Sequence, residues 1–202
     1  MLRLCLLAGA TLAGATSPAE ATTPAAAAFP AGPYKVTLSH AKVTSMDPSN
    51  QYIDVLTPVG AAGQTFPLVA YAHGFADNGE DDYKRLGPAI AAWGYVVAFA
   101  NSCRFGCLKN CKTLPHDPSC FGTYYEEQLK VIAWAQSGAD GAVGLPINHT
   151  AQVGVAGHSM GGQSTAFSAS YKNASQHNIG AAVLHHGFTH SYPAMTVPFP
   201  LF

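Results

Sequence analysis

The sequence predicts a single α/β domain in which a mostly parallel central sheet is flanked by helices. Two observations support this prediction: segments with the composition of strands alternate with segments of helical periodicity, and several strands are continuous apolar runs. Such a run is typical of a strand that is buried on both faces of its sheet. The chain has no internal repeat, and its one clear change of composition after the N-terminal segment is a cysteine-bearing loop.

The first half of the expected fold runs from residue 51 to residue 100. Residues 51–57 (QYIDVLT) and 68–73 (LVAYAH) are rich in β-branched and aromatic residues and are bounded by Pro and Gly, which predicts strands. Apolar residues at three- and four-residue spacing predict a helix over 82–93, with Gly94 as its stop. Residues 95–100 (YVVAFA) are apolar throughout and predict a fully buried strand.

The second half follows the cysteine-bearing loop 101–121, which interrupts the pattern. Amphipathic periodicity predicts a helix at about 124–136. Residues 151–157 predict a short buried strand, and the residues of 160–171 are compatible with a helix. A last strand is expected over 180–185 (GAAVLH). Strand and helix therefore alternate to the end of this region.

The N-terminus has the layout of a secretory signal peptide over residues 1–21. It carries one basic residue (Arg3), an apolar run from about 4 to 15 and a small-x-small triplet that ends at Ala21, where we expect cleavage. A buried N-terminal helix is the alternative. Residues 22–33 are low in complexity and predict a flexible leader, so the expected protein is exported.

Composition excludes some partners. The formal net charge is −1, so electrostatics give no reason to expect nucleic acid or an anionic membrane surface as a partner. No segment is apolar over the roughly 20 residues that a membrane-spanning helix needs, so we expect no stable membrane insertion.

Cysteine usage supports export. Cys5 would leave with the signal peptide, and four cysteines remain: Cys103, Cys107, Cys111 and Cys120. An oxidising compartment would pair them into two disulfides, for which three connectivities are open. The alternative is a zinc site that recruits His116, but the cysteine spacing does not match the usual CxxC pairs. Two sequons, at Asn148 and Asn173, are candidate glycosylation sites.

The segment Gly157-His158-Ser159-Met160-Gly161 fits the pattern G-x-S-x-G, which marks the nucleophile elbow of α/β-hydrolases. The chemistry needs a sharp turn from strand to helix that lifts the serine oxygen clear of the sheet. Glycines on both sides allow the strained backbone and a close approach of strand and helix. The predicted strand and helix around Ser159 supply this context, and the alternative is a Gly/Ser-rich turn with no chemical role.

A second motif, Tyr71-Ala-His-Gly-Phe75, lies at the end of an upstream buried strand. In a hydrolase of this type one oxyanion-hole N–H follows the nucleophile and the other comes from the loop after the third strand. By position these are the backbone N–H groups of Met160 and Phe75, which would stabilise charge on a tetrahedral intermediate. We expect His73 to shape the loop rather than to act as the general base, and His158 to be a packing or pocket residue.

Together these segments resemble the α/β-hydrolase superfamily, in the branch of the dienelactone hydrolases, chlorophyllases and cutinase-like polyester hydrolases. The resemblance is carried by AHGF at 72–75, LGPAIAAWGYVVAFAN at 86–101 and VAGHSMGG at 155–162, and it covers most of 51–202. It implies a serine carboxylic-ester hydrolase that works through an acyl-enzyme without a cofactor, with Phe75 as an aromatic clamp beside the serine. The cysteine-bearing loop is not part of the family's pattern.

The partners of the serine are not where this family places them. The triad order is Ser, then Asp or Glu, then His, and none of the 43 residues after Ser159 is acidic. The acid usually follows a late strand, and residues 197–202 resemble the start of that strand. The histidines after the serine precede any such acid, so we expect pocket or surface roles for them: His177, His185, His186 and His190. The upstream acids lie in predicted loops or helix starts with no fold-based reason to face the serine: Asp77, Asp81, Asp82, Asp117 and Asp140.

The expectation is therefore that residues 34–202 form a partial α/β-hydrolase domain, as an N-terminal fragment or truncated gene model, with the acid and base beyond residue 202. The expected protein is a secreted enzyme that cleaves a small-molecule or polymeric ester at Ser159. A first alternative is a non-catalytic protein on a decayed hydrolase fold that holds an apolar ligand near Phe75 and Ser159. A second is a thioester- or peptide-directed hydrolase of the same fold.

Overall fold

The computed structural model describes residues 30–107, 123–138 and 142–187. Its strands are β1 (Lys35–Lys42), β2 (Tyr52–Val59), β3 (Leu68–Ala72), β4 (Val96–Ala100), β5 (Val153–His158) and β6 (Ile179–His185). Its helices are α1 (Gly79–Tyr83), α2 (Leu86–Ala92), α3 (Tyr124–Ser137), α4 (Met160–Ser168) and α5 (Tyr171–His177). Several predicted features lie outside the described residues: 1–21, 22–29, Cys111, His116, Asp117, Cys120, Asp140, His190 and 197–202.

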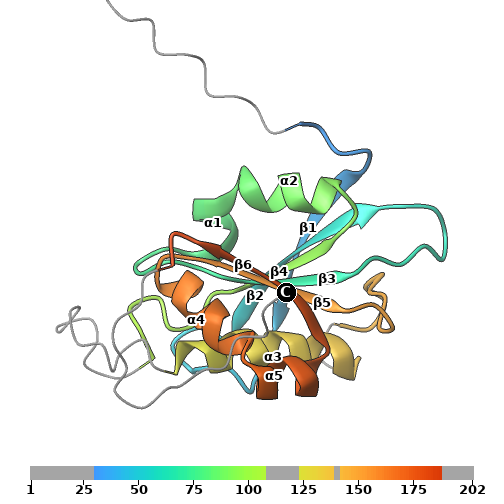
Figure 1. Cartoon of the computed structure of the whole chain (residues 1–202). Helices are drawn as coiled ribbons and strands as arrows, with labels where there is room; N and C mark the ends of the chain where they lie inside the picture. The colour runs from blue at the N-terminus through green and yellow to red at the C-terminus, as the bar shows by residue number, and fades with distance from the viewer. Residues whose placement is uncertain (1–29, 108–122, 139–141, 188–202) are drawn as a thin grey trace, which may run out of the picture.

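The strands form one mixed sheet in the order β1-β2-β4-β3-β5-β6. The four strands β3 to β6 are parallel, whereas β1 pairs antiparallel with β2 and β2 pairs antiparallel with β4. Helices α1 and α2 cover one face of the sheet, and α3, α4 and α5 lie on the other (Figure 1). The predicted α/β class with a mostly parallel sheet is confirmed.

Alternation along the strands divides the core between the two faces. Val55 and Ala98 belong to the cluster on the α3 side, while their neighbours Leu56 and Phe99 belong to the cluster on the α2 side. Successive side chains of a strand point to opposite faces of the sheet. A strand whose two faces are both buried is therefore apolar at every position. All five residues of β4 are buried, as the run YVVAFA predicts.

Three expectations about elements are wrong. The helix expected over 82–93 is two helices, α1 and α2, because Pro88 lacks an N–H and its ring clashes with the carbonyl four residues earlier, at Lys84, where the helix breaks. The helix expected over 160–171 ends at Ser168, because Ser170 is extended before α5 begins. Strand β1 is missed, because its residues are mostly exposed and show no apolar pattern.

Residues 30–34 lie against the end of α2. The Tyr34 N–H donates to the Ala92 carbonyl at 3.1 Å, and the Trp93 indole N–H donates to the Pro30 carbonyl at 3.3 Å. The last residues of the predicted leader therefore contact the domain. No helix in the described ranges is long and apolar enough to cross a membrane.

A buried amide joins the elements on which the candidate site rests. Gln128 of α3 is fully buried, and its side-chain NH₂ donates to the carbonyls of Ala70 and Ala156, both at 2.9 Å. The same nitrogen lies 3.3 Å from the Thr165 hydroxyl, which donates to the Gly161 carbonyl. Strands β3 and β5 and helix α4 are thus held in a fixed relation just below the serine.

Candidate active site

The predicted site residues gather at the carboxyl ends of the parallel strands. Ser159 follows β5, and the loop that begins with His73 follows β3. From β3 the chain crosses to β4 on one side, and β5 lies on the other side of β3, so the strand order reverses at this point. In open α/β sheets, ligands bind outside the carboxyl ends of strands at such a reversal.

Ser159 occupies a sharp turn between β5 and α4. Its backbone has φ 53° and ψ −114°, a combination that L-residues rarely adopt. Its N–H donates to the His185 carbonyl of β6 at 2.9 Å, which ties the turn to the neighbouring strand. A β-carbon on Gly157 would overlap the Gly161 carbonyl oxygen, and one on Gly161 would overlap the Ala72 carbonyl oxygen. The strand, turn and helix predicted around the serine are therefore present, and both glycines are sterically required.

Backbone strain concentrates at this edge of the sheet. Five non-glycine residues of the described ranges have positive φ: Ala76, Cys103, Ser159, Asn178 and His186. All but Asn178 lie just beyond the carboxyl ends of β3 to β6. Residues in sparsely populated conformations cost about 1–3 kcal/mol each and cluster at functional sites. Within the described residues, this edge of the sheet is therefore the strongest candidate for a functional site.

The two predicted oxyanion residues share one buried cluster. Met160 is fully buried and opens α4, so its N–H has no acceptor within the helix. Phe75 packs against the cluster that contains Met160, Ala72, Tyr124 and Cys103. The positive end of the α4 dipole points toward the same turn. The geometry brings Phe75 and Met160 together beside Ser159.

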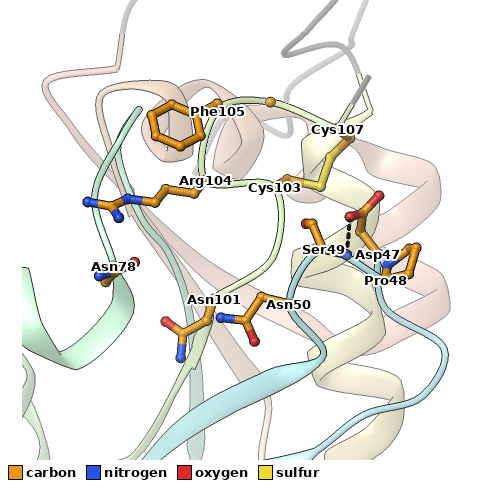
Figure 2. A pocket seen from close by; sticks show the side chains of 11 residues that line it. Asp47, Pro48, Ser49, Asn50, Asn78, Asn101, Cys103, Arg104, Phe105 and Cys107 are labelled. Atoms are coloured by element: carbon orange, nitrogen blue, oxygen red, sulfur yellow. Dashed lines mark hydrogen bonds between the residues drawn. A yellow bond between two sulfur atoms is a disulfide. The ribbon is translucent and has the colours of Figure 1, made fainter. Parts of the chain in front are cut away.

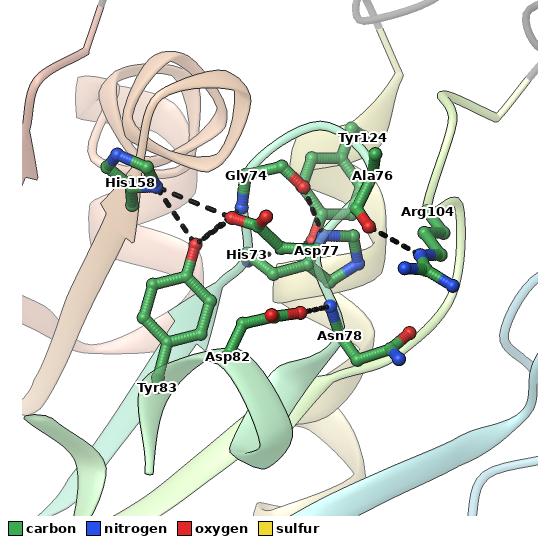
Figure 3. A network of polar contacts seen from close by, with 10 residues as sticks. All are labelled: His73, Gly74, Ala76, Asp77, Asn78, Asp82, Tyr83, Arg104, Tyr124 and His158. Atoms are coloured by element: carbon green, nitrogen blue, oxygen red, sulfur yellow. Dashed lines mark hydrogen bonds and ion pairs between the residues drawn. The ribbon is translucent and has the colours of Figure 1, made fainter. Parts of the chain in front are cut away.

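A polar network at the same edge centres on the hydroxyl of Tyr83 (Figure 3). This oxygen accepts the Gly74 N–H at 2.8 Å, donates to Asp77 Oδ2 at 2.6 Å and lies 3.0 Å from His158 Nδ1. Because the hydroxyl has one proton and gives it to Asp77, the hydrogen of the third contact comes from His158. Burial raises the pKa of Tyr83, and the bond to Asp77 raises it further, so the hydroxyl stays protonated.

The network joins the loop after β3 to the residue before the serine. His158 Nδ1 also lies 3.5 Å from Asp77 Oδ2. From the sequence, Asp77 has no fold-based reason to face the serine, and His158 is expected to be a packing or pocket residue. The structure instead brings both together through Tyr83, which the sequence analysis did not select. Tyr83 and His158 are 75 residues apart, so no local pattern could have linked them.

His73 has the loop-shaping position expected of it. The ring is fully buried, with Nδ1 2.7 Å from the Gly74 carbonyl and Nε2 2.9 Å from the Ser102 carbonyl. Burial lowers the pKa of His73, which favours the neutral ring. A neutral ring has its one N–H on either Nδ1 or Nε2, so it donates to one of these two carbonyls and lies against the other. The imidazole therefore joins the loops after β3 and β4.

Three histidines meet at the ends of β5 and β6. The ring centroids of His158 and His185 are 5.0 Å apart, and those of His185 and His186 are 4.5 Å apart. Burial lowers the pKa of His185, and the neighbouring His186 and His158 lower it further. Within the described ranges no group of three or more His, Cys, Asp or Glu side chains is placed to hold a metal ion.

The cysteine-bearing loop contributes one described disulfide, between Cys103 and Cys107, with their Cα atoms 4.6 Å apart. This bond occupies two of the thiols that the zinc alternative requires. At the candidate glycosylation site Asn173, the side-chain N–H donates to the Phe167 carbonyl at 3.0 Å. This side-chain nitrogen is the atom that would carry a glycan. Asn148 instead uses its Oδ1 to accept bonds from the following turn, at Thr150.

A hollow of about 670 Å³ lies beside this disulfide (Figure 2). The turn at 47–50, Asn78, Asn101 and the loop 103–107 line it. Ser159 is not among its lining residues, so this hollow is not the pocket expected around the serine.

Removing the Tyr83 hydroxyl tests the network. In Tyr83→Phe the buried Gly74 N–H loses its acceptor, and we expect the free energy of unfolding to fall by about 1–3 kcal/mol. Tyr52→Phe is the matched control, because Tyr52 is 55% exposed and the change should stay within about 0.5 kcal/mol. Urea denaturation measures both. Equal midpoints for the two variants would show that the hydroxyl does not hold the loop.

No protein-family model matches the chain, and a search of the curated proteins finds no match. The assignment of function therefore depends on the residues and on the geometry described above.

Proposed function

We propose that this protein is a secreted serine hydrolase of the α/β-hydrolase fold that cleaves carboxylic esters through an acyl-enzyme, with Ser159 as the nucleophile. The observation that carries the proposal is the backbone of Ser159, at φ 53° and ψ −114° between β5 and α4. A serine held in such a conformation between two sterically required glycines is typical of a nucleophile elbow. A turn without chemistry has no reason to retain the strain.

The proposed reaction is an acyl transfer in two halves. Ser159 Oγ attacks the ester carbonyl carbon, its proton passes to a general base, and the carbonyl oxygen becomes an oxyanion. The N–H groups of Phe75 and Met160 would stabilise that charge. The C–O bond to the alcohol then breaks, the base returns the proton to the alcohol, and the acyl group remains on Ser159. Water repeats the sequence and releases the carboxylic acid, so no cofactor is needed.

None of the described residues is assigned as the triad acid or base. No acidic residue follows Ser159 in this sequence, and this fold takes its acid and then its histidine from late loops. Asp77 contacts the elbow at His158, but its carboxylate also accepts the Tyr83 proton. Asp77 is therefore engaged in holding the loop. Export is proposed with the enzyme, since a Cys103–Cys107 disulfide favours an oxidising compartment.

Covalent labelling of the full-length gene product tests the proposal. A fluorophosphonate should add to Ser159, and peptide mass mapping should find no label in Ser159→Ala and full label in the control Ser170→Ala. Turnover of short-chain nitrophenyl esters should exceed that of the matching anilides, and the reverse preference would favour the peptide-directed alternative. A wild-type protein that takes no label at Ser159 and does not hydrolyse the esters would contradict the proposal.

A non-catalytic role in holding an apolar ligand is the second candidate. An apolar groove of about 610 Å³ lies on the α2 side of β3, β5 and β6, and Ser159 is not among its lining residues. Val183 and Leu184 of β6 line it and are 61% and 48% exposed. Two results together would favour the ligand-binding role over the hydrolase. Ser159 would take no label, and a fluorescent fatty acid would bind both the wild type and Ser159→Ala.

A further inference from the structure

The turn over residues 103–107 is hydrogen-bonded to the loop that carries Phe75. The Ala76 N–H donates to the Arg104 carbonyl at 2.7 Å, and the Arg104 side-chain Nε donates to the Ala76 carbonyl at 2.5 Å. Both backbone polar groups of Ala76 are therefore bonded to one residue, Arg104. Figure 3 shows the Arg104 guanidinium turned toward Ala76.

Aromatic packing also joins the turn 103–107 to the loop that carries Phe75. The rings of Phe75 and Phe105 meet edge to face with centroids 5.6 Å apart, and the Arg104 guanidinium lies 5.5 Å from the Phe105 ring centroid. Edge-to-face pairs favour a defined orientation of both rings. Phe75 is therefore contacted by the same turn that binds the next residue of its loop.

The disulfide gives the turn a fixed shape. Cys103 and Cys107 close it covalently, and the Gly106 N–H donates to the Cys103 carbonyl at 2.7 Å within it. Cys103 is only 2% exposed and belongs to the buried cluster of Met160, against which Phe75 and Cys107 also pack. The turn is thus anchored on the side of both predicted oxyanion residues.

Ala76 needs such support. Its φ of 67° is a conformation that a residue with a β-carbon holds only where its surroundings impose it. Without the turn, Ala76 would be free to relax to negative φ, and the shift of its backbone would displace the neighbouring Phe75 and its N–H. A displacement of about 1 Å at a catalytic group can lower the rate about 10²-fold.

We propose that the disulfide-closed turn 103–107 is a positioning device for the oxyanion hole, with Arg104 as its positioning residue on Ala76. The inference depends on the proposed hydrolase function. The turn 103–107 belongs to the cysteine-bearing loop, which is not part of the pattern of the family that the sequence resembles. Reduction of Cys103–Cys107 would then lower turnover without removing any group that contacts the substrate.

Three variants of the full-length gene product test the device: Arg104→Ala, Arg104→Lys and the double variant Cys103→Ser/Cys107→Ser. For Arg104→Ala and the double variant we expect kcat to fall about tenfold or more, with KM changed less than twofold, because ground-state binding does not use the oxyanion hole. Arg104→Lys should recover part of the loss, since its ammonium still donates but lacks the rigid guanidinium. Arg85→Ala, at an exposed arginine before α2, is the matched control and should keep kcat.

Hydrogen exchange supplies a readout that does not need activity. The Ala76 amide, which donates to the Arg104 carbonyl, should exchange at least tenfold faster in the double cysteine variant and in the reduced protein than in the wild type. Unchanged exchange, or an unchanged kcat in Arg104→Ala and the double variant of an active enzyme, would overturn the inference and leave the proposed function intact. A wild-type protein without Ser159-dependent hydrolysis would instead refute the proposed function and, with it, the catalytic purpose of the turn.

Discussion

Replacing Ser159 with glycine is expected to stabilise the protein and to abolish ester hydrolysis in one step. The serine has φ 53° and ψ −114°, at a cost of about 1–3 kcal/mol to a residue with a β-carbon. Glycine adopts this conformation without the clash, but its extra freedom in the unfolded chain costs about 0.5–1 kcal/mol. The free energy of unfolding should therefore rise by about 1 kcal/mol, measured by urea denaturation.

Ser159→Ala separates the two effects. Alanine keeps the β-carbon and the strain but has no hydroxyl, so stability should stay within about 0.5 kcal/mol of the wild type. Turnover of a nitrophenyl ester should fall by about 10³-fold or more in both variants, because the nucleophile is lost. Equal stability of the Gly and Ala variants would show that the backbone at 159 is not strained. Hydrolysis retained by both would remove Ser159 from the reaction.

The parts of the site that the sequence predicts are those encoded locally. The strand, turn and helix around Ser159 are read from consecutive residues, since a short apolar run, a pair of glycines and a helix-compatible segment each dictate their own conformation. The loop of Phe75 is likewise recognised from the strand that precedes it. The carboxyl ends of parallel strands then bring the two segments to one edge without further information.

The contacts that stabilise this edge depend on tertiary packing. Tyr83 of α1 reaches both the loop after β3 and His158 at the end of β5, and Arg104 reaches Ala76 from the disulfide-closed turn after β4. Periodicity carries no signal for either contact. The misplaced helix boundary is different, because the break before α2 follows from the chemistry of Pro88, which the sequence displays.

Gly161→Ala is expected to destabilise the fold by about 3 kcal/mol or more. Two effects oppose each other at this position. Gly161 lies in the first turn of α4, where alanine is favoured over glycine by up to about 1 kcal/mol. A β-carbon there would overlap the Ala72 carbonyl oxygen and approach the His73 carbonyl oxygen at 2.6 Å, and both atoms are backbone that no rotamer change can move. The steric collision outweighs the helix propensity, so α4 must shift away from β3 or the domain fails to fold.

Gly63→Ala is the control, because its β-carbon would meet no atom within 4 Å and only its φ of 79° opposes the change, at a cost of about 1 kcal/mol. Thermal and urea unfolding of the two variants compare the stability cost of the steric collision at Gly161 with that of backbone strain at Gly63. An insoluble Gly161→Ala variant beside a soluble Gly63→Ala variant would also show that the collision costs more. The close approach of α4 to β3 places the N–H of Met160 beside the loop of Phe75. A Gly161→Ala variant as stable as the control would therefore contradict both the packing and the proposed oxyanion hole that depends on it.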